Sequence, residues 1–243
     1  MKTQLVFVML IASLTGFFAH ASDITERLQG KDTITYTVAF NGIPSGKIVW
    51  RYAGKRHING KVLDVISVAS HTKILKLLNL ESDEDIMLDE KTMLPVMVER
   101  NVKMFGNQEF IEELYDQKAG IVTITRKDSG KVDQIIRKKP PIHNILALLY
   151  FFPQSIALKE RETLSFNLPT QSVQLRVRGI KRINVKARKN MQAYLLSGSG
   201  ARKFNLWLDV NDKLPLRMDF FVSLGKVVIE RQDAPDANKS FGK

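Results

Sequence analysis

One long apolar run constrains this chain most. Residues 138–153 read KKPPIHNILALLYFFP, and apolar side chains recur in the run at helical spacing: Ile142, Ile145, Leu146, Leu149 and Tyr150. The residues between them are also mostly apolar, so a helix here must be buried on most sides. The run is shorter than the about 20 residues that span a bilayer. We predict a buried helix over Ile142–Phe152, opened by Pro140–Pro141 and closed by Pro153, which either fills the core or lines an apolar cavity.

The remainder of the chain alternates β-rich segments with turn residues. The predicted strands cover residues 33–40, 47–52, 62–70, 81–88, 96–104, 108–116, 121–126, 131–137, 163–168, 173–185, 192–197, 203–209, 216–222 and 226–231. Residues 23–28 and 72–80 are predicted to form helical turns, although 72–80 also fits a strand. No β-α-β alternation divides the chain. We therefore predict a mainly β fold, an antiparallel, strongly curved sheet or open barrel around one short apolar helix. It forms a single domain over 22–232, followed by a disordered tail over 233–243.

The first residues have the pattern of a secretory signal peptide. Lys2 is followed by an apolar stretch over Leu5–Phe18, and Ala19-His20-Ala21 fits the small-residue cleavage pattern. We expect residues 1–21 to be removed after Ala21 and the protein to be exported, in a Gram-negative bacterium to the periplasm. The chain contains no Cys, so its stability in that compartment must come from its core.

The charge is strongly basic and unevenly distributed. Lys and Arg number 37 against 25 Asp and Glu, a formal net charge of +12. Residues 174–189, here called the basic ribbon, contain seven cations: Arg176, Arg178, Lys181, Arg182, Lys186, Arg188 and Lys189. With a turn near Gly179–Asn184, we expect Arg176, Arg178, Lys186 and Arg188 to gather on one face of a hairpin. Such a face fits anionic lipid headgroups, lipopolysaccharide phosphates or acidic glycans, or it is a solvated strand face. Outside the cytoplasm, nucleic acid is not the expected partner.

Signatures of catalysis and metal binding are missing from the sequence. The histidines after the predicted cleavage site are His57, His71 and His143, and none is spaced from another as zinc ligands usually are. The acidic residues over 81–85 lack the spacing of a calcium loop. No G-x-S-x-G motif or P-loop occurs. We expect no metal, no cofactor and no enzymatic activity, although carboxylates far apart in sequence could still pair for glycoside hydrolysis.

Several segments resemble the DUF3108 family, exported bacterial proteins of unknown function. The resemblance covers about residues 33–231 and rests on Tyr36–Gly46 in the first hairpin, Ser82-Asp83 with the turn at Asp89–Pro95, the Leu149-Tyr150-Phe151 segment, and Trp207-Leu208-Asp209 with Asp212 and Leu214-Pro215. The family often has an acidic residue ahead of the central segment, where this sequence has His143-Asn144. The resemblance implies a curved-sheet fold like that of periplasmic carriers of lipid or lipoprotein, and it implies no reaction.

The function most consistent with these patterns is binding of an amphiphile by an exported, non-enzymatic envelope protein. The acyl part would contact Ile145, Leu149, Tyr150 and Phe152 of the helix, and the anionic head would contact Arg176, Arg178, Lys186 and Arg188. Two alternatives remain open. One is a module of envelope assembly that binds another protein, docked on a sheet edge. The other is a hydrolase that acts on glycans.

The signal-peptide pattern makes one direct prediction. If the chain is exported and cleaved after Ala21, the protein isolated from the periplasm should begin at Ser22. N-terminal sequencing of that protein measures this, and a periplasmic form that still begins at Met1 would contradict cleavage.

Overall fold

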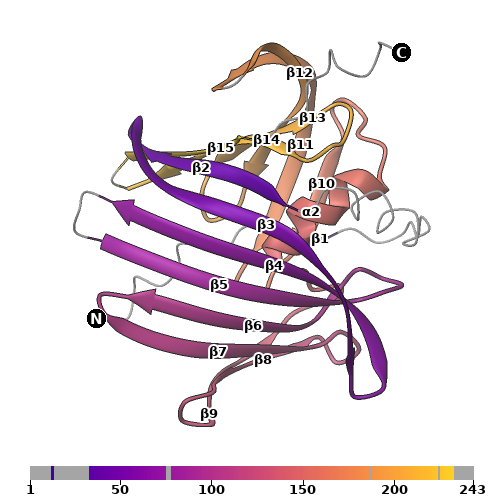
Figure 1. The fold of residues 1–243 in the computed structure, drawn as a ribbon. Helices are drawn as coiled ribbons and strands as arrows, with labels where there is room; N and C mark the ends of the chain where they lie inside the picture. The colour runs from indigo at the N-terminus through magenta and orange to yellow at the C-terminus, as the bar shows by residue number, and fades with distance from the viewer. Residues whose placement is uncertain (1–11, 14–32, 75–77, 187, 224, 233–243) are drawn as a thin grey trace, which may run out of the picture.

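The computed structural model describes residues 12–13, 33–74, 78–186, 188–223 and 225–232. These residues form one antiparallel sheet and one helix, α2 (Ile145–Ser155) (Figure 1). The strands are β1 (Ala12–Ser13), β2 (Ile34–Phe40), β3 (Ile43–Ile58), β4 (Lys61–Ile74), β5 (Leu78–Asp89), β6 (Pro95–Met104), β7 (Asn107–Asp116), β8 (Ile121–Arg126), β9 (Lys131–Arg137), β10 (Thr163–Asn167), β11 (Ser172–Val185), β12 (Arg188–Ser199), β13 (Phe204–Asp209), β14 (Pro215–Val222) and β15 (Gly225–Arg231). No helix among the described residues has the length and apolarity to cross a membrane.

The sheet consists of two runs of strands in sequence order, β10–β15 and β2–β9, which meet where β15 pairs with β2. Its strand order is β1-β10-β11-β12-β13-β14-β15-β2-β3-β4-β5-β6-β7-β8-β9, and every pair is antiparallel. The last strand, β15, pairs with β2, so that Arg231 lies opposite Tyr36. The sheet is open between β9 and β10, which are the strands that flank α2 in sequence. The predicted antiparallel, curved sheet around one helix is confirmed.

The core lies on the side of the sheet that faces α2. Along β11 the burial alternates residue by residue, with Val173, Leu175 and Val177 buried between exposed neighbours. The same alternation along the other strands collects apolar side chains on one face. Residues Ala147 to Phe151 of α2 are all at most 6% exposed and belong to this cluster. The helix therefore fills the space inside the curve of the sheet.

A capping side chain sets the start of α2. The Asn144 side chain accepts hydrogen bonds from the Leu146 and Ala147 amides at 2.9 and 3.3 Å, which satisfies two free donors of the first turn. The prediction that Pro140–Pro141 open the helix and Pro153 closes it is wrong. The helix begins after Asn144 and continues through Pro153 to Ser155. A proline near the end of a helix removes only one intrahelical hydrogen bond, so the helix can extend past it.

Two hairpins, β3–β4 and β11–β12, contain the longest strands, and both bend at a bulge. The register shifts between Tyr52 and Gly54 in the first and between Val177 and Ile180 in the second. Gly54 and Gly179 have φ of +85° and +83° at these points, a conformation that glycine adopts without strain. The bulges let strands of 14 to 16 residues follow the curvature of the sheet.

The described parts of the segment 72–80, which are residues 72–74 and 78–80, are strands rather than the favoured helical turn. Its described part belongs to β4 up to Ile74 and to β5 from Leu78, and Thr72 lies opposite Leu80. Pairing with neighbouring strands therefore overrides the local helical spacing of its leucines. The predicted turn at 23–28, the tail over 233–243 and all of the signal segment except Ala12–Ser13 lie outside the described residues.

Truncation of Leu149 tests whether α2 supports the sheet. Leu149 is 6% exposed within the core, so Leu149→Ala should lower the free energy of unfolding by about 2–5 kcal/mol. Leu149→Asp should lower it further, because the new carboxylate would be buried without a partner. Urea denaturation measures both changes. Leu114→Ala is the matched control, because Leu114 is 44% exposed and its truncation should lower the free energy of unfolding much less. An equal decrease in the two variants would contradict the packing of α2.

Candidate functional site

Four polar side chains from three neighbouring strands meet on the inner face of the sheet. They are Glu84 of β5, Arg100 of β6, and Glu113 and Tyr115 of β7, and they are here called the buried ion cluster. Arg100 Nε lies 2.9 Å from Glu84 Oε2, and Arg100 Nη1 lies 3.0 Å from Glu113 Oε1. The Tyr115 hydroxyl donates to Glu113 Oε2 at 2.7 Å. One guanidinium therefore bridges two carboxylates in the interior, where an unpaired charge would be costly.

The buried ion cluster lies at the N-terminus of α2. A small cavity is lined by residues of the cluster, of the helix start and of the connection between β10 and β11: Glu84, Arg100, Tyr115, Asn144, Ile145, Leu168 and Pro169. The partial positive charge of a helix N-terminus stabilises nearby carboxylates, so the cluster and the helix stabilise each other. The cavity volume is about 10 Å³, which is about the space that one water molecule needs.

Burial and the neighbouring charges shift the pKa values of Arg100 and Tyr115 in this cluster. Burial alone would lower the pKa of Arg100, but the carboxylates of Glu84 and Glu113 outweigh it and raise that pKa above its usual value. Burial, followed by the Glu113 carboxylate, raises the pKa of Tyr115 well above its usual range, so the hydroxyl remains a donor. Next to the helix, burial lowers the pKa of His143 to about 4. His143 is therefore neutral near pH 7, and Asn144 occupies the capping position beside it.

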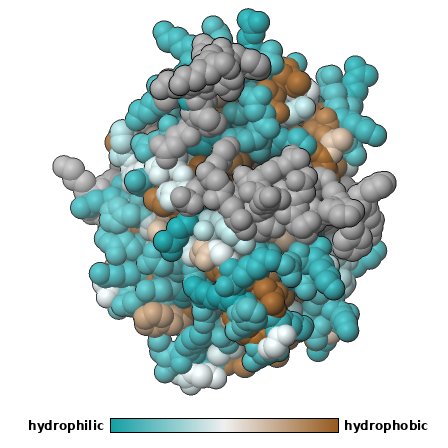
Figure 2. Space-filling view, turned by 45° about the vertical axis from the view of Figure 1, so that its right-hand side comes forward, coloured by the Kyte–Doolittle hydropathy of each residue, from teal (hydrophilic) through white to brown (hydrophobic). Residues whose placement is uncertain are grey.

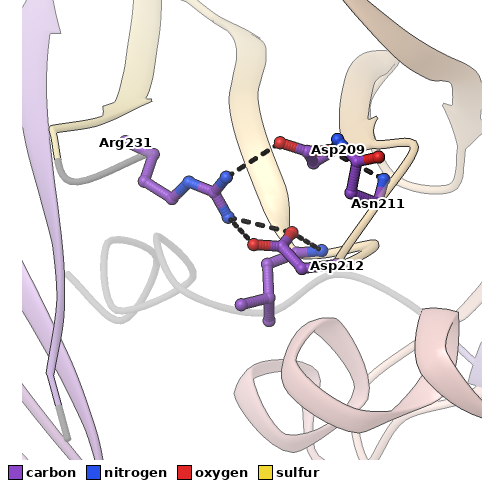
Figure 3. A network of polar contacts seen from close by, with 5 residues as sticks. Asp209, Asn211, Asp212 and Arg231 are labelled. Atoms are coloured by element: carbon purple, nitrogen blue, oxygen red, sulfur yellow. Dashed lines mark hydrogen bonds and ion pairs between the residues drawn. The ribbon is translucent and has the colours of Figure 1, made fainter. Parts of the chain in front are cut away.

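A second buried cluster joins the end of β15 to the turn between β13 and β14 (Figure 3). The Arg231 side chain is 1% exposed, and its Nη2 donates to Asp209 Oδ2 at 3.1 Å. Its Nη1 lies 3.1 Å from both carboxylate oxygens of Asp212. Asp209 also accepts from the Asn211 amide at 2.8 Å, which fixes the turn. The two carboxylates thereby attach β15 to the turn that follows β13.

The same turn contacts the other end of α2. Lys213, which has a φ of +53°, extends its ammonium group to the backbone oxygen of Ile156 at 2.8 Å. Ile156 is the C-cap residue of α2, and a cation at a helix C-terminus is stabilised by the negative end of the dipole. Both ends of α2 therefore meet side chains of the charge that the helix dipole favours.

Aromatic rings connect the middle of the helix to the sheet. Ring centroids of Tyr36 and Trp50 lie 5.0 Å apart, those of Trp50 and Tyr150 lie 6.0 Å apart, and those of Tyr150 and Phe151 lie 5.0 Å apart. Burial raises the pKa of Tyr36 above its usual value, so its hydroxyl stays protonated. These ring contacts hold α2 against the sheet. No group of three or more potential metal ligands occurs in the described part of the chain.

The predicted helix residues have mainly a packing role. Leu149 and Tyr150 are buried in the main core, and Ile145 packs against it while lining the small cavity. Phe152 belongs to α2, but its side chain lies outside the described ones. Of the two predicted possibilities for the helix, filling the core is the one that the described residues show.

The predicted gathering of four ribbon cations is wrong. Gly179 forms a bulge rather than a turn, and β11 continues to Val185. Arg176 and Arg178 are exposed in β11 beside Ser197 of β12, whose hydroxyl accepts from Arg178 Nε at 3.2 Å. Lys186 and Arg188 lie at the far end of the hairpin. At about 3.3 Å per residue, roughly 26 Å of strand separates Arg178 from Lys186.

The buried ion cluster was not predicted from the sequence, although one signal for it is present. Ile111, Glu113 and Tyr115 alternate along β7 and face the core together, so a charged residue at such a position indicates a buried partner. Glu84 points inward, while its neighbour Asp85 points to the other face and pairs with Arg56. The identity of the partner, Arg100, depends on strand register, which sequence spacing does not determine.

Comparisons with known proteins give a family and a fold. The family model described as a protein of unknown function, DUF3108, matches residues 35–232. No curated protein matches the chain. A β-barrel-like protein of the domain of unknown function DUF1849 from Brucella abortus is 7% identical with a TM-score of 0.51, over 83% of this chain and 98% of that one. At this identity the similarity shows the fold alone.

Two further solved structures match more weakly. The MucA/MucB complex of Pseudomonas aeruginosa is 16% identical with a TM-score of 0.25, over 89% of this chain and 59% of that one. A DUF1329 family protein from Desulfovibrio piger is 10% identical with a TM-score of 0.23, over 90% and 93% of the two chains. Neither similarity carries an argument about this chain.

Removal of the central guanidinium tests the buried ion cluster. Arg100→Met should lower the free energy of unfolding by about 3–5 kcal/mol at pH 7, because two carboxylates would remain buried without a cation. Urea denaturation at pH 7 measures the effect. Arg56→Met is the control, because Arg56 pairs with Asp85 at the surface and should cost at most about 1 kcal/mol; similar losses in the two variants would contradict the proposed role.

Proposed function

This chain belongs to the DUF3108 family, whose function is unknown, and we propose that it is an exported, non-enzymatic protein of the cell envelope that binds an anionic surface through its basic ribbon. The pattern over residues 1–21 supports export. The net charge of +12 supports an anionic partner in a compartment without nucleic acid.

The observation that carries the proposal is a set of cations on β11 without acidic partners. Arg176, Arg178 and Lys181 are exposed along this strand. Arg176 lies opposite Ser197, and Lys181 lies opposite Ala193. Within the described residues, none of the three cations has a carboxylate oxygen within 4.0 Å. Glu160 does approach this strand, where it lies against Gly179, but it forms no such pair.

Cations close together on one strand repel one another, and water and salt screen that repulsion only in part. An anionic membrane relieves it and adds about 1 kcal/mol for each basic residue near the surface. The outward direction of Arg176 and Arg178 allows both to contact a flat layer of headgroups. Lys186, Arg188 and Lys189, at the end of the hairpin, extend the same basic ribbon.

The packed interior favours a surface site over an internal one. The buried residues of α2 occupy the space that an acyl chain would need, and the small cavity at its N-terminus has room for about one water molecule. We therefore propose that the protein binds the anionic headgroup of an amphiphile at its surface and that no acyl chain enters the space inside the sheet. The proposal of a non-enzymatic protein is supported by the pairing of the buried carboxylates Glu84 and Glu113 with Arg100.

Vesicle binding tests the basic ribbon. The exported protein should sediment with vesicles that contain phosphatidylglycerol and not with pure phosphatidylcholine vesicles at low salt, and added salt should release it. Arg176→Glu with Arg178→Glu should reduce the bound fraction at least tenfold while leaving the urea midpoint unchanged, because both side chains are exposed.

The matched control is Lys47→Glu with Arg51→Glu on β3. Both residues are exposed, the change in net charge is the same, and β3 is six strands away from β11 in the sheet order. An equal loss of vesicle binding in the control would mean that net charge alone attracts the protein. Equal binding of the unmodified protein to the two kinds of vesicle would overturn the proposal.

A further inference from the structure

A second surface, at the other end of the sheet, has a different character. Phe110 and Leu114 of β7 and Val132 and Ile135 of β9 are 41%, 44%, 48% and 59% exposed. These four side chains are here called the outer apolar face. By contrast, most of the molecular face shown in Figure 2 is hydrophilic, with its hydrophobic side chains in small separate patches.

Strand register places the outer apolar face on one side of the sheet, with Glu112, Thr123 and Thr125 between its four apolar side chains. Leu114 lies opposite Thr123 of β8, which lies opposite Ile135. The neighbouring residues Tyr115, Val122 and Ile136 contact the core, so this row points away from it. The register shifts after the pair of Ile124 and Gln134, and Val132 then lies opposite Thr125. Because of this bulge, Val132 and Ile135 share the outward face although they are three residues apart. The row of Leu114, Thr123 and Ile135 therefore reaches β9, the last strand of the sheet.

The edge of that last strand is open. β9 pairs with β8 and ends the strand order, and every residue of Lys131–Ile135 is exposed. Among the described residues, no other strand pairs with it. An edge strand presents backbone N–H and C=O groups that can pair with another extended chain. A lipid surface cannot satisfy these groups in the regular spacing of a strand, so a peptide fits this edge better than a membrane does.

The charge at this edge indicates the composition of the peptide. Lys131, Arg137, Lys138 and Lys139 lie in or directly after β9, and no described carboxylate pairs with any of them within 4.0 Å. Asp133, the one acidic residue of the strand, lies 3.5 Å from Arg126. A second copy of this chain would bring the same cations, and symmetric pairing about Gln134 would set Lys131 opposite Arg137. Like charges in that position oppose pairing, which disfavours a dimer through β9.

We propose that β9 binds an extended segment of another protein as an added strand, with apolar side chains of the segment against Val132 and Ile135 and acidic side chains near Lys131 and Arg137. The segment would complete the hydrogen bonds of the edge and cover the outer apolar face. This interaction does not depend on the basic ribbon, which lies on β11 and the β11–β12 turn.

Three capped synthetic peptides provide the test. The first alternates valine and threonine over five residues and has two glutamates at each end. The second has lysines in place of the glutamates, and the third has proline in place of the central valine, which removes a backbone donor. Fluorescence anisotropy at low salt should show binding of the first peptide to the exported protein, with at least tenfold weaker binding of the other two.

Variants of the protein locate the site. Val132→Lys with Ile135→Lys should weaken binding of the first peptide at least tenfold, because lysine on an edge strand opposes strand addition. Both residues are exposed, so the urea midpoint should stay unchanged. Arg176→Glu with Arg178→Glu should leave peptide binding unchanged, which separates this proposal from vesicle binding by the basic ribbon.

Three results would overturn the proposal. The first is equal binding of the glutamate and proline peptides, which would exclude backbone pairing. The second is concentration-dependent dimerisation that the Val132→Lys and Ile135→Lys variant abolishes, which would assign the edge to a second copy. The third is loss of vesicle binding rather than peptide binding in that variant, which would assign the outer apolar face to a membrane.

Discussion

The rest of the structure depends on the fixed position of α2 inside the curved sheet. An apolar helix could slide or rotate against an apolar surface, because hydrophobic contacts have little direction. Polar contacts at its two ends remove that freedom. The buried ion cluster lies at the N-terminus, and Lys213 contacts the last backbone carbonyl at the C-terminus. Each contact comes from strands far from α2 in sequence, so the helix and the sheet fix each other's position.

The elements could be predicted from the sequence because their signals are local. The alternation in β7 and β11 and the turn residues between strands gave the antiparallel sheet, and the apolar run gave the helix. The predicted boundaries of the elements were wrong where an interaction with a distant part of the chain determines the structure. Gly179 indicated a turn by itself, but pairing of β11 with β12 makes it a bulge. The proline pair suggested a helix start, but the capping bonds of Asn144 set the start later.

The candidate site was less predictable than the fold because it depends on partners brought together by register. Arg231 and Asp209 are 22 residues apart, and their contact depends on β13, β14 and β15 lying side by side in the sheet. Glu84 and Glu113 share Arg100 only in the observed alignment of β5, β6 and β7. By contrast, the exposure of Arg176 and Arg178 follows from alternation within one strand, so this part of the predicted site agrees with the described strand.

The topology also determines where other molecules can reach the sheet. Because β15 pairs with β2, the meander has its free ends only at β9 and beside β10 among the described strands. Apolar side chains fill the inner face, so binding has to use the outer face or these ends. β9 leads directly into the 138–144 segment, where the Gln117 side chain bonds both backbone groups of Ile142 at 2.7 and 2.9 Å. A strand added to β9 would therefore lie next to the part of the chain that positions α2, while the basic ribbon, on the other side of the opening, stays free for a second contact.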